Sequence, residues 1–427
     1  MEGRGCVDQF LLLLLILEKD RKLFAAFMDL EKAYDRVDRK GLWDTLRVYG
    51  VGGQLLEGIR SFYENASASV WVNGELSESF NVEADVRQGC IMSPWLFNIY
   101  MDGCIREMKV GVWDLGARLN VRGVEQPLVA GLYADDTVLL AESEGMLQRI
   151  VDEFDRVCKR RKLKVNAGKS KVMVFERARE QIINFAKSYR VGSEAIHGCK
   201  IWLGKEKMEE VNEFKYLGTI LCKHGSMEGE IRERTVKSRQ VMGALERVMK
   251  GRNVSMAVKR GIRNSVILPT LSYASETWTW NAAQQSRIRA VEMSYLRGAC
   301  GVSRWDRESN EETYGRFGMS EAAVRMDWRV VEWVKRSTLR WYGHVMRMNE
   351  GDFTKRVYES TIEGRGVRGR PPVKWINRVE EYWRERGGRG LECAERESLN
   401  RETWRQLCCG HPLGGGSREG MRRRRYR

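Results

Sequence analysis

This sequence has few histidines, and its cysteines follow no recognisable spacing. These two features exclude some kinds of catalytic site and metal site. Only four of its 427 residues are histidine, and none belongs to a Ser-His-Asp or Cys-His arrangement, so covalent catalysis of that kind is not expected. Its ten cysteines form no pair of C-x2-C motifs, and Cys408, Cys409 and His411 lack the spacing of tetrahedral zinc ligands. With no secretion signal either, we expect reduced thiols in an intracellular protein.

A long apolar segment is also missing. Residues 11–17 (LLLLLIL) are apolar, but a membrane-spanning helix needs roughly 20 such residues. Asp8 lies just before this run and no small-residue cleavage site follows it, so a buried helix is a better interpretation than a signal peptide. No membrane partner is therefore expected.

Positive charge is what the sequence has in excess. Lysine and arginine outnumber aspartate and glutamate by 74 to 58, a net charge of +16. This excess favours a polyanionic partner, because basic side chains that neutralise phosphates release condensed counterions; an ordinary basic surface is the alternative. Residues 331–427 carry 23 basic and 13 acidic side chains, so most of the excess lies in less than a quarter of the chain.

Up to about residue 221, hydrophobic periodicity predicts a mixture of strands and helices. The first expected elements are a strand at 23–28, a helix from 31 to 46 and a β-hairpin at 67–82 around Asn73-Gly74. Ser93 and Pro94 are expected to open a helix, as N-cap and first helical residue, that runs to about residue 108.

The rest of the chain becomes steadily more helical. A second hairpin is expected at 128–141, then an amphipathic helix at 145–163 and two short strands at 171–175 and 214–221. From 229 to about 346 nearly everything is expected to be helix, with Pro269 and residues 298–301 as breaks.

Two adjacent carboxylates, Asp135 and Asp136, stand at the tip of the second predicted hairpin. In a tight turn they repel each other unless something offsets the charge. A divalent cation does so, and Mg²⁺ prefers oxygen ligands of this kind. A solvated Asp-Asp turn is the alternative for the dipeptide alone.

Asp29 shifts that balance toward a metal site. It ends the apolar strand at 23–28, and a carboxylate there, facing a hairpin tip with two more, can hold a pair of metal ions. In two-metal phosphoryl transfer, one ion activates the attacking 3′-hydroxyl and the other stabilises the leaving oxygen. Such catalysis needs no covalent nucleophile.

A third segment, residues 87–94 (RQGCIMSP), lies between these acids in the sequence. Gly89 allows close backbone approach, and a helix starting near Pro94 offers free N–H groups. The turn could pack under a base pair or a sugar. A plain strand-to-helix turn is the alternative.

In order and spacing, these segments resemble the reverse transcriptase family. Residues 26–35 (AFMDLEKAYD) resemble its first palm motif, 87–94 its second, and 133–136 (YADD) its YxDD signature. Residues 167–170 (AGKS) resemble the fourth motif and 214–218 (FKYLG) the primer-grip strand pair. The resemblance covers residues 6–222 and is closest to non-LTR (LINE-type) retrotransposon polymerases, whose tails the Trp-rich segment from Arg340 to Trp375 also resembles.

The resemblance implies a role for each matching residue. Asp29, Asp135 and Asp136 would be catalytic and hold two Mg²⁺ ions, with Mn²⁺ as a substitute. Lys169 would protonate the departing pyrophosphate, a solvated loop lysine being the alternative. Tyr34 would be the steric gate against ribonucleotides. The other implied contacts are Leu30, Arg87, Gln88 and Gly89 with substrate, and Tyr216, Leu217, Gly218, Arg368 and Arg370 with nucleic acid.

Two basic segments in the last 97 residues have alternative interpretations. Residues 368–371 (RGRP) resemble the core of an AT-hook, which inserts arginines into the minor groove, but a basic flexible linker is the favoured interpretation. Arg422 to Arg425 could be a nuclear import signal or a charged tail. A nuclear location is the expectation that follows.

The expected fold is α+β: a reverse-transcriptase palm with remnant fingers at 1–222, a helical thumb at 223–330 and a basic helical tail at 331–427. Only 28 residues precede Asp29, and residues 5–9 resemble the end of a fingers motif, so the chain resembles an N-terminally truncated element. The expected function is RNA-directed DNA polymerase acting on an RNA template, a DNA primer or target and dNTPs. The alternatives are an inactive remnant that only binds nucleic acid and, third, a maturase or telomerase-like polymerase.

Overall fold

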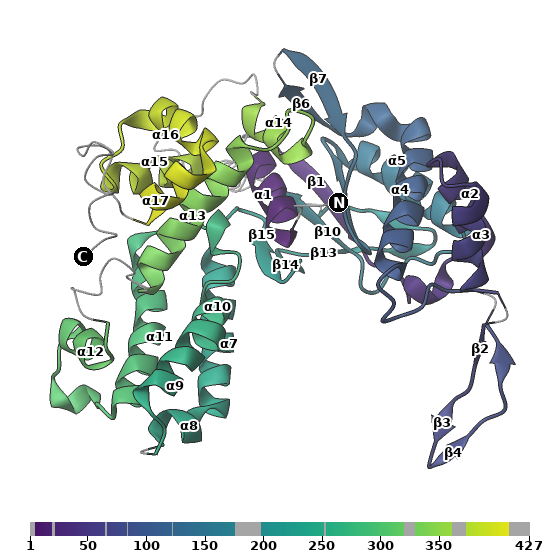
Figure 1. Ribbon diagram of the computed structural model, residues 1–427. Coiled ribbons are helices and arrows are strands. Elements are labelled where there is room, and N and C mark those ends of the chain that lie inside the picture. Colours follow the sequence, from purple (N-terminus) through teal and green to yellow (C-terminus); the bar gives the residue numbers. More distant parts are fainter. Residues whose placement is uncertain are drawn as a thin grey trace, which may run out of the picture.

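Figure 1 shows the computed structural model of the chain, which describes residues 5–409 apart from 19–21, 65, 83, 122, 176–197, 252, 320–328 and 361–372. Its centre is a five-stranded sheet in the order β13–β10–β1–β9–β8. The strands are β1 (Leu23–Met28), β8 (Ala130–Tyr133), β9 (Asp136–Ala141), β10 (Lys171–Phe175) and β13 (Glu209–Glu210). The expected antiparallel palm sheet is confirmed for β10, β1, β9 and β8, which pair antiparallel in turn. The two-residue edge strand β13 pairs parallel with β10.

Strand β1 is buried along its whole length because helices cover both faces of the sheet. Successive side chains of a strand point to opposite faces. Phe27 and its alternate neighbours join one hydrophobic core, whereas Met28 and its alternates join another. Asp29, the next residue, lies just past the end of β1.

Four helices cover the face to which Met28 points. These are α2 (Arg39–Val48), α3 (Gly53–Ser61), α4 (Ser93–Val112) and α5 (Glu144–Arg160). Helix α5 begins after the N-cap Ser143 and buries Ile150, Phe154 and Val157, so the amphipathic helix expected there is confirmed.

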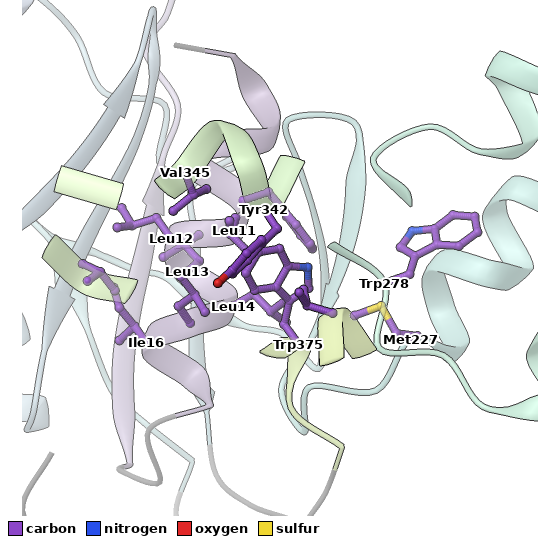
Figure 2. Packing of buried hydrophobic residues seen from close by; sticks show 14 of the residues in the cluster. Leu11, Leu12, Leu13, Leu14, Ile16, Met227, Trp278, Tyr342, Val345 and Trp375 are labelled. Carbon is purple, nitrogen blue, oxygen red and sulfur yellow. The ribbon is translucent and has the colours of Figure 1, made fainter. Parts of the chain in front are cut away.

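Helix α1 (Cys6–Leu17) covers the opposite face together with helices from the far end of the chain. Leu11 to Ile16 are all buried, which confirms the buried helix. Figure 2 shows Leu11 to Leu14 and Ile16 close to Tyr342, Val345 and Trp375, which belong to the same hydrophobic core. Among the described residues, no helix is both long and apolar enough to cross a membrane.

The tail helices form a tryptophan-rich core in addition to carrying basic charge. They are α13 (Val330–Met346), α14 (Phe353–Glu359), α15 (Trp375–Glu385), α16 (Gly390–Leu399) and α17 (Arg401–Cys408). Trp375, Trp383 and Trp404 are at most 1% exposed, and the indole N–H of Trp404 donates to the Leu339 carbonyl at 2.8 Å. Residues 329–360 and 373–409 are therefore integral to the fold.

The region after 222 has further helices: α7 (Glu228–Ala244), α8 (Glu246–Lys250), α9 (Met256–Ile262), α10 (Leu268–Leu271), α11 (Ala282–Cys300) and α12 (Asn310–Arg316). Figure 1 shows them on the side of the molecule opposite α2 to α5. Gly301 ends α11 with φ 71°, as expected, whereas Gly298 lies inside that helix. Pro269 lies in the first turn of α10, directly after the short π-helix Arg263–Ile267.

The hairpin expected at 67–82 is confirmed and projects from the body (Figure 1). Asn73 and Gly74 have φ of 51° and 88°, as a primed turn requires. Its ladder is interrupted, with β2 (Ser67–Ala68) paired to β5 (Phe80–Asn81) and β3 (Trp71–Val72) to β4 (Glu75–Leu76). Smaller hairpins are β6 (Ala117–Val121) with β7 (Val124–Leu128) and β11 (Trp202–Leu203) with β12 (Glu206–Lys207).

Three expected boundaries are wrong. The helix expected from 31 begins only at Arg39, because Asp38 caps it by accepting from the Gly41 amide, and Tyr34–Arg36 form a 3-10 turn. Ser93 is inside α4, whose N-cap is Met92, and that helix continues to Val112. The strand expected at 214–221 is a hairpin, β14 (Glu213–Tyr216) and β15 (Thr219–Cys222), because Leu217 and Gly218 both have positive φ.

Candidate active site

The three aspartates lie at one end of the sheet. Strand β1 pairs with β9 so that Met28 is opposite Thr137, which places Asp29 and Asp136 just beyond the same pair. Asp136 opens β9 opposite Tyr133, the last residue of β8. Ala134 has φ 53°, so the chain reverses tightly and Asp135 stands at the tip.

The carboxylates act on one another electrostatically. Partial burial, followed by the negative charge of Asp135 and then that of Asp29, raises the pKa of Asp136. Burial and then the negative charge of Asp135 likewise raise the pKa of the Tyr34 hydroxyl. Negative charge thus accumulates where the resemblance implies a cation.

The donor set is chemically suited to a hard divalent ion. Among the described residues, however, no group of three or more His, Cys, Asp or Glu side chains is arranged to hold a metal by itself. Mg²⁺ is commonly held by one or two carboxylates together with waters and substrate phosphates. Asp29, whose side chain is 39% exposed, and its two neighbours fit that open kind of site.

The loop 166–170 is fastened to the end of β1. The Asp29 amide donates to Ser170 Oγ at 3.1 Å, and the Asn166 amide donates to the Asp29 carbonyl at 2.8 Å. These contacts bring Lys169 Nζ to 3.8 Å from Asp29 Oδ2 on a side chain that is 72% exposed. The structure therefore places Lys169 at the site, and its role as a general acid stays a prediction.

Tyr34 and Leu30 follow Asp29 in different environments. The Tyr34 ring stacks on Phe97 with centroids 4.5 Å apart, which holds it beside Asp135. Leu30 is 6% exposed, with its side chain in the core, and its backbone bridges to Val165. Only the main chain of Leu30 is left to face a substrate.

The second motif lies beside Tyr34. The Val86 amide donates to the Tyr34 carbonyl at 3.0 Å, and Gln88 Nε2 donates to Asp35 Oδ1 at 2.9 Å. Arg87 and Gly89 are exposed, and Gly89 has φ 80°. The structure thus brings the predicted substrate residues 87–89 next to the steric-gate candidate.

The predicted nucleic-acid contacts are placed differently. The Tyr216 side chain is 2% exposed and packs on Phe27 with ring centroids 5.4 Å apart, so it points into the core. Leu217 and Gly218 form a turn whose carbonyls accept from Tyr273 and Arg234. Arg368 and Arg370 lie outside the described residues.

Sequence reasoning missed the N-terminal support of the YADD hairpin. A hydrogen bond to the Cys6 thiol, followed by burial, raises the pKa of Tyr133 to about 12. A Cβ on Gly131 of β8 would lie 3.4 Å from Gln9 Oε1. The first turn of α1 therefore packs against the YADD hairpin. The spacing of the sequence motifs gives no indication of such a long-range contact.

Residues 1–221 match the family model described as reverse transcriptase (RNA-dependent DNA polymerase). Because this match covers more than half of the 427 residues, the chain belongs to the reverse transcriptase family. Its similarity to the R2 and jockey mobile elements makes it a non-LTR, LINE-type member.

Two relatives illustrate that similarity. The chain is 30% identical over 220 residues to the Retrovirus-related Pol polyprotein from type-2 retrotransposable element R2DM of Drosophila melanogaster, an alignment that covers 50% of this chain and 19% of that protein. It is 25% identical over 296 residues to the RNA-directed DNA polymerase from mobile element jockey of Drosophila funebris, covering 67% of this chain and 29% of that one. The chain thus spans less than a third of either relative's length.

Among solved structures, an apo telomerase from Candida tropicalis matches with a TM-score of 0.38 and 13% identity. The match covers 83% of this chain and 57% of the telomerase chain. So slight a likeness carries no weight for function.

Proposed function

We propose that the chain is an RNA-directed DNA polymerase that adds dNTPs to a primer 3′-hydroxyl on an RNA template, with nicked target DNA as the natural primer. One observation carries this: Asp29, Asp135 and Asp136 lie at the same end of the sheet and interact electrostatically, with Tyr34 and Lys169 nearby. Membership of the reverse transcriptase family supports it.

Mg²⁺ is the cofactor we propose, as two ions held by Asp29, Asp135 and Asp136. Bound there, such ions would activate the attacking hydroxyl and stabilise the charge on the leaving oxygen. Burial and then the negative charges of Asp135 and Asp29 raise the pKa of Asp136. The part that comes from the neighbouring carboxylates supports the proposal, because clustered negative charge favours a cation.

The protein's own residues would position the reactants. Tyr34, fixed by stacking on Phe97, would crowd a 2′-hydroxyl and so select deoxynucleotides. Arg87 and Gln88 would contact the nucleotide and templating base. Lys169, which lies beside Asp29, would donate a proton to the leaving pyrophosphate.

We further propose that residues 1–222, 223–330 and 331–427 act as polymerase domain, thumb and tail, and that the protein works in the nucleus. The helical composition of the second and third segments supports the division. The terminal arginines, which lie outside the described residues, support the location.

The test is primer extension on poly(rA)–oligo(dT) with Mg²⁺ and dTTP. Asp135→Ala should lower the rate on the order of 100-fold or more, because it removes stabilisation of transition-state charge. Asp44→Ala, on the exposed surface of α2, is the matched control and should extend like the wild type.

No extension by the wild type, or equal extension by wild type and Asp135→Ala, would contradict the proposal. Salt-sensitive binding of RNA that Asp135→Ala leaves unchanged, without extension, would instead identify an inactive nucleic-acid-binding remnant.

A further inference from the structure

The turn of the β14–β15 hairpin is tied to the catalytic end of the sheet on one side. In β14, the Phe214 ring stacks on Phe27 with centroids 4.4 Å apart, and Tyr216 packs on the same ring. Phe27 is two residues before Asp29. The position of the hairpin is thus set relative to the carboxylates.

On its other side, the turn accepts hydrogen bonds from two side chains of the helical region after residue 222. The Tyr273 hydroxyl donates to the Leu217 carbonyl at 3.0 Å, and the Arg234 guanidinium donates to the Gly218 carbonyl. Arg234 also lies 4.7 Å over the Tyr273 ring. A Cβ on Gly218 would come within 3.2 Å of that ring, so the turn and Tyr273 are in close contact.

Arg234 is itself held by a buried acid. Glu230, fully buried, pairs with Arg234 and accepts from the Ile220 amide of β15 at 2.7 Å. Burial raises the pKa of Glu230, although Arg234 acts in the opposite direction. Helix α7 can approach β15 closely because Gly229 has no side chain. A Cβ at this position would lie only 2.8 Å from Ile220 Cγ2.

This arrangement is more than a hairpin needs to fold. The strands β14 and β15 already pair over four residue positions, and the half-buried turn could leave its carbonyls to water. A buried ion pair, in contrast, costs desolvation that its attraction often only balances. The network therefore serves to fix where the turn lies.

We propose that Arg234 and Tyr273 are positioning residues, which hold the Leu217–Gly218 turn at a set place beside the carboxylates and so align the primer end for attack. This rests on the proposed polymerase function. It assigns to two residues outside the reverse-transcriptase motifs a role in the rate of the chemical step, because misplacing reactants by an ångström can cost about 100-fold.

Tyr273→Phe tests the proposal, since it removes one hydroxyl and keeps the ring that packs on Gly218. The matched control is Tyr295→Phe, because the Tyr295 hydroxyl also donates to a backbone carbonyl, that of Lys259 at 2.7 Å, but away from the hairpin. Pre-steady-state extension of oligo(dT) on poly(rA), with primer–template in excess over protein, separates the burst amplitude, which counts active molecules, from the burst rate.

For Tyr273→Phe we expect a burst rate about tenfold lower, with the amplitude and the KM for dTTP unchanged. Arg234→Lys, which keeps the charge beside Glu230 but loses the guanidinium fork, should behave similarly. Tyr295→Phe should match the wild type. An unchanged rate in Tyr273→Phe, or a fall in amplitude alone, overturns the positioning role while leaving the proposed function intact.

Hydrogen exchange of a peptide covering 213–222 gives a readout that needs no activity. Protection should fall in Tyr273→Phe and Arg234→Lys but not in Tyr295→Phe. Unchanged protection in the first two variants overturns the proposal even if the polymerase is active. Absence of wild-type extension overturns the proposed function, and with it the alignment of the primer.

Discussion

At the scale of single residues, Asp136 has an ionised form that its surroundings disfavour. It is the first residue of β9 and lies near two other carboxylates. Partial burial and then the negative charges of Asp135 and Asp29 raise its pKa. A raised pKa in the folded state means that ionisation of Asp136 weakens the fold. This penalty is present at neutral pH and disappears as the pH falls through the raised pKa.

Asp136→Asn should therefore stabilise the metal-free protein at pH 7, raising the melting temperature by about 1–3 °C. The gain should shrink as the pH is lowered, because wild-type Asp136 is then protonated too. Thermal unfolding in EDTA at several pH values measures it.

Adding Mg²⁺ should reverse the order, stabilising the wild type more than the variant, because a ligand that binds the native state stabilises it. A variant less stable than the wild type in EDTA at pH 7 would show that repulsion does not dominate at Asp136.

At this scale, the residues of the site that belong to the sequence motifs could be predicted. Asp29, Tyr34, Gln88 and Lys169 were all expected, and the structure places them around one end of the sheet. Tyr216 was expected to touch nucleic acid, and its side chain is buried instead. A motif names the residue but does not say which way its side chain points.

At the scale of elements, α1 is a single helix that we expect to contribute strongly to the free energy of unfolding. Its side chains from Leu11 to Ile16 are buried between the sheet and the tail helices. A helix that is apolar all round belongs in an interior, which is why its burial was predictable.

Leu11→Ala should lower the free energy of unfolding by about 2–5 kcal/mol, because Leu11 is 0% exposed and the change leaves a cavity. Leu55→Ala in α3, where the side chain is 63% exposed, should cost less than about 0.5 kcal/mol. Urea denaturation compares the two, and equal losses would contradict the packing of α1.

Element boundaries were less predictable than the elements themselves. The hairpin at Asn73-Gly74 was expected because those residues readily adopt positive φ. The turn at Leu217-Gly218 was missed because leucine seldom adopts φ near 49°. Tyr273 and Arg234 hold this turn from outside, so local propensity gives no warning of it.

At the scale of the whole molecule, the two ends of the described chain share one core. The Trp375 amide donates to Glu18 Oε1 at 2.6 Å across 357 positions, and its indole N–H donates to the Glu276 carbonyl at 2.7 Å. Trp375 thus joins α15 to the end of α1 and to the 3-10 turn Ser275–Thr277. Disturbing the tail should disturb the sheet that carries the aspartates.

Trp375→Ala should cost about 3–5 kcal/mol and lower hydrogen-exchange protection at residues 10–16 as well as around 375–383. Trp305→Ala, where the side chain is 91% exposed, is the matched control and should change neither. Full protection of 10–16 in Trp375→Ala would mean that the tail and α1 are independent.

Local chemistry could be read from the amino-acid order alone: the carboxylates and their order, the strands that present them, the Asn73-Gly74 turn and the apolar character of α1. Neighbours along the chain decide these features through side-chain period, φ preference and charge. Long-range packing, in contrast, places α1 and the tail in one core and turns Tyr216 inward. It also lets Arg234 and Tyr273 hold a turn up to 56 positions away. Apolar burial has no direction, so a pattern shows which face seeks a partner but not which distant segment provides it.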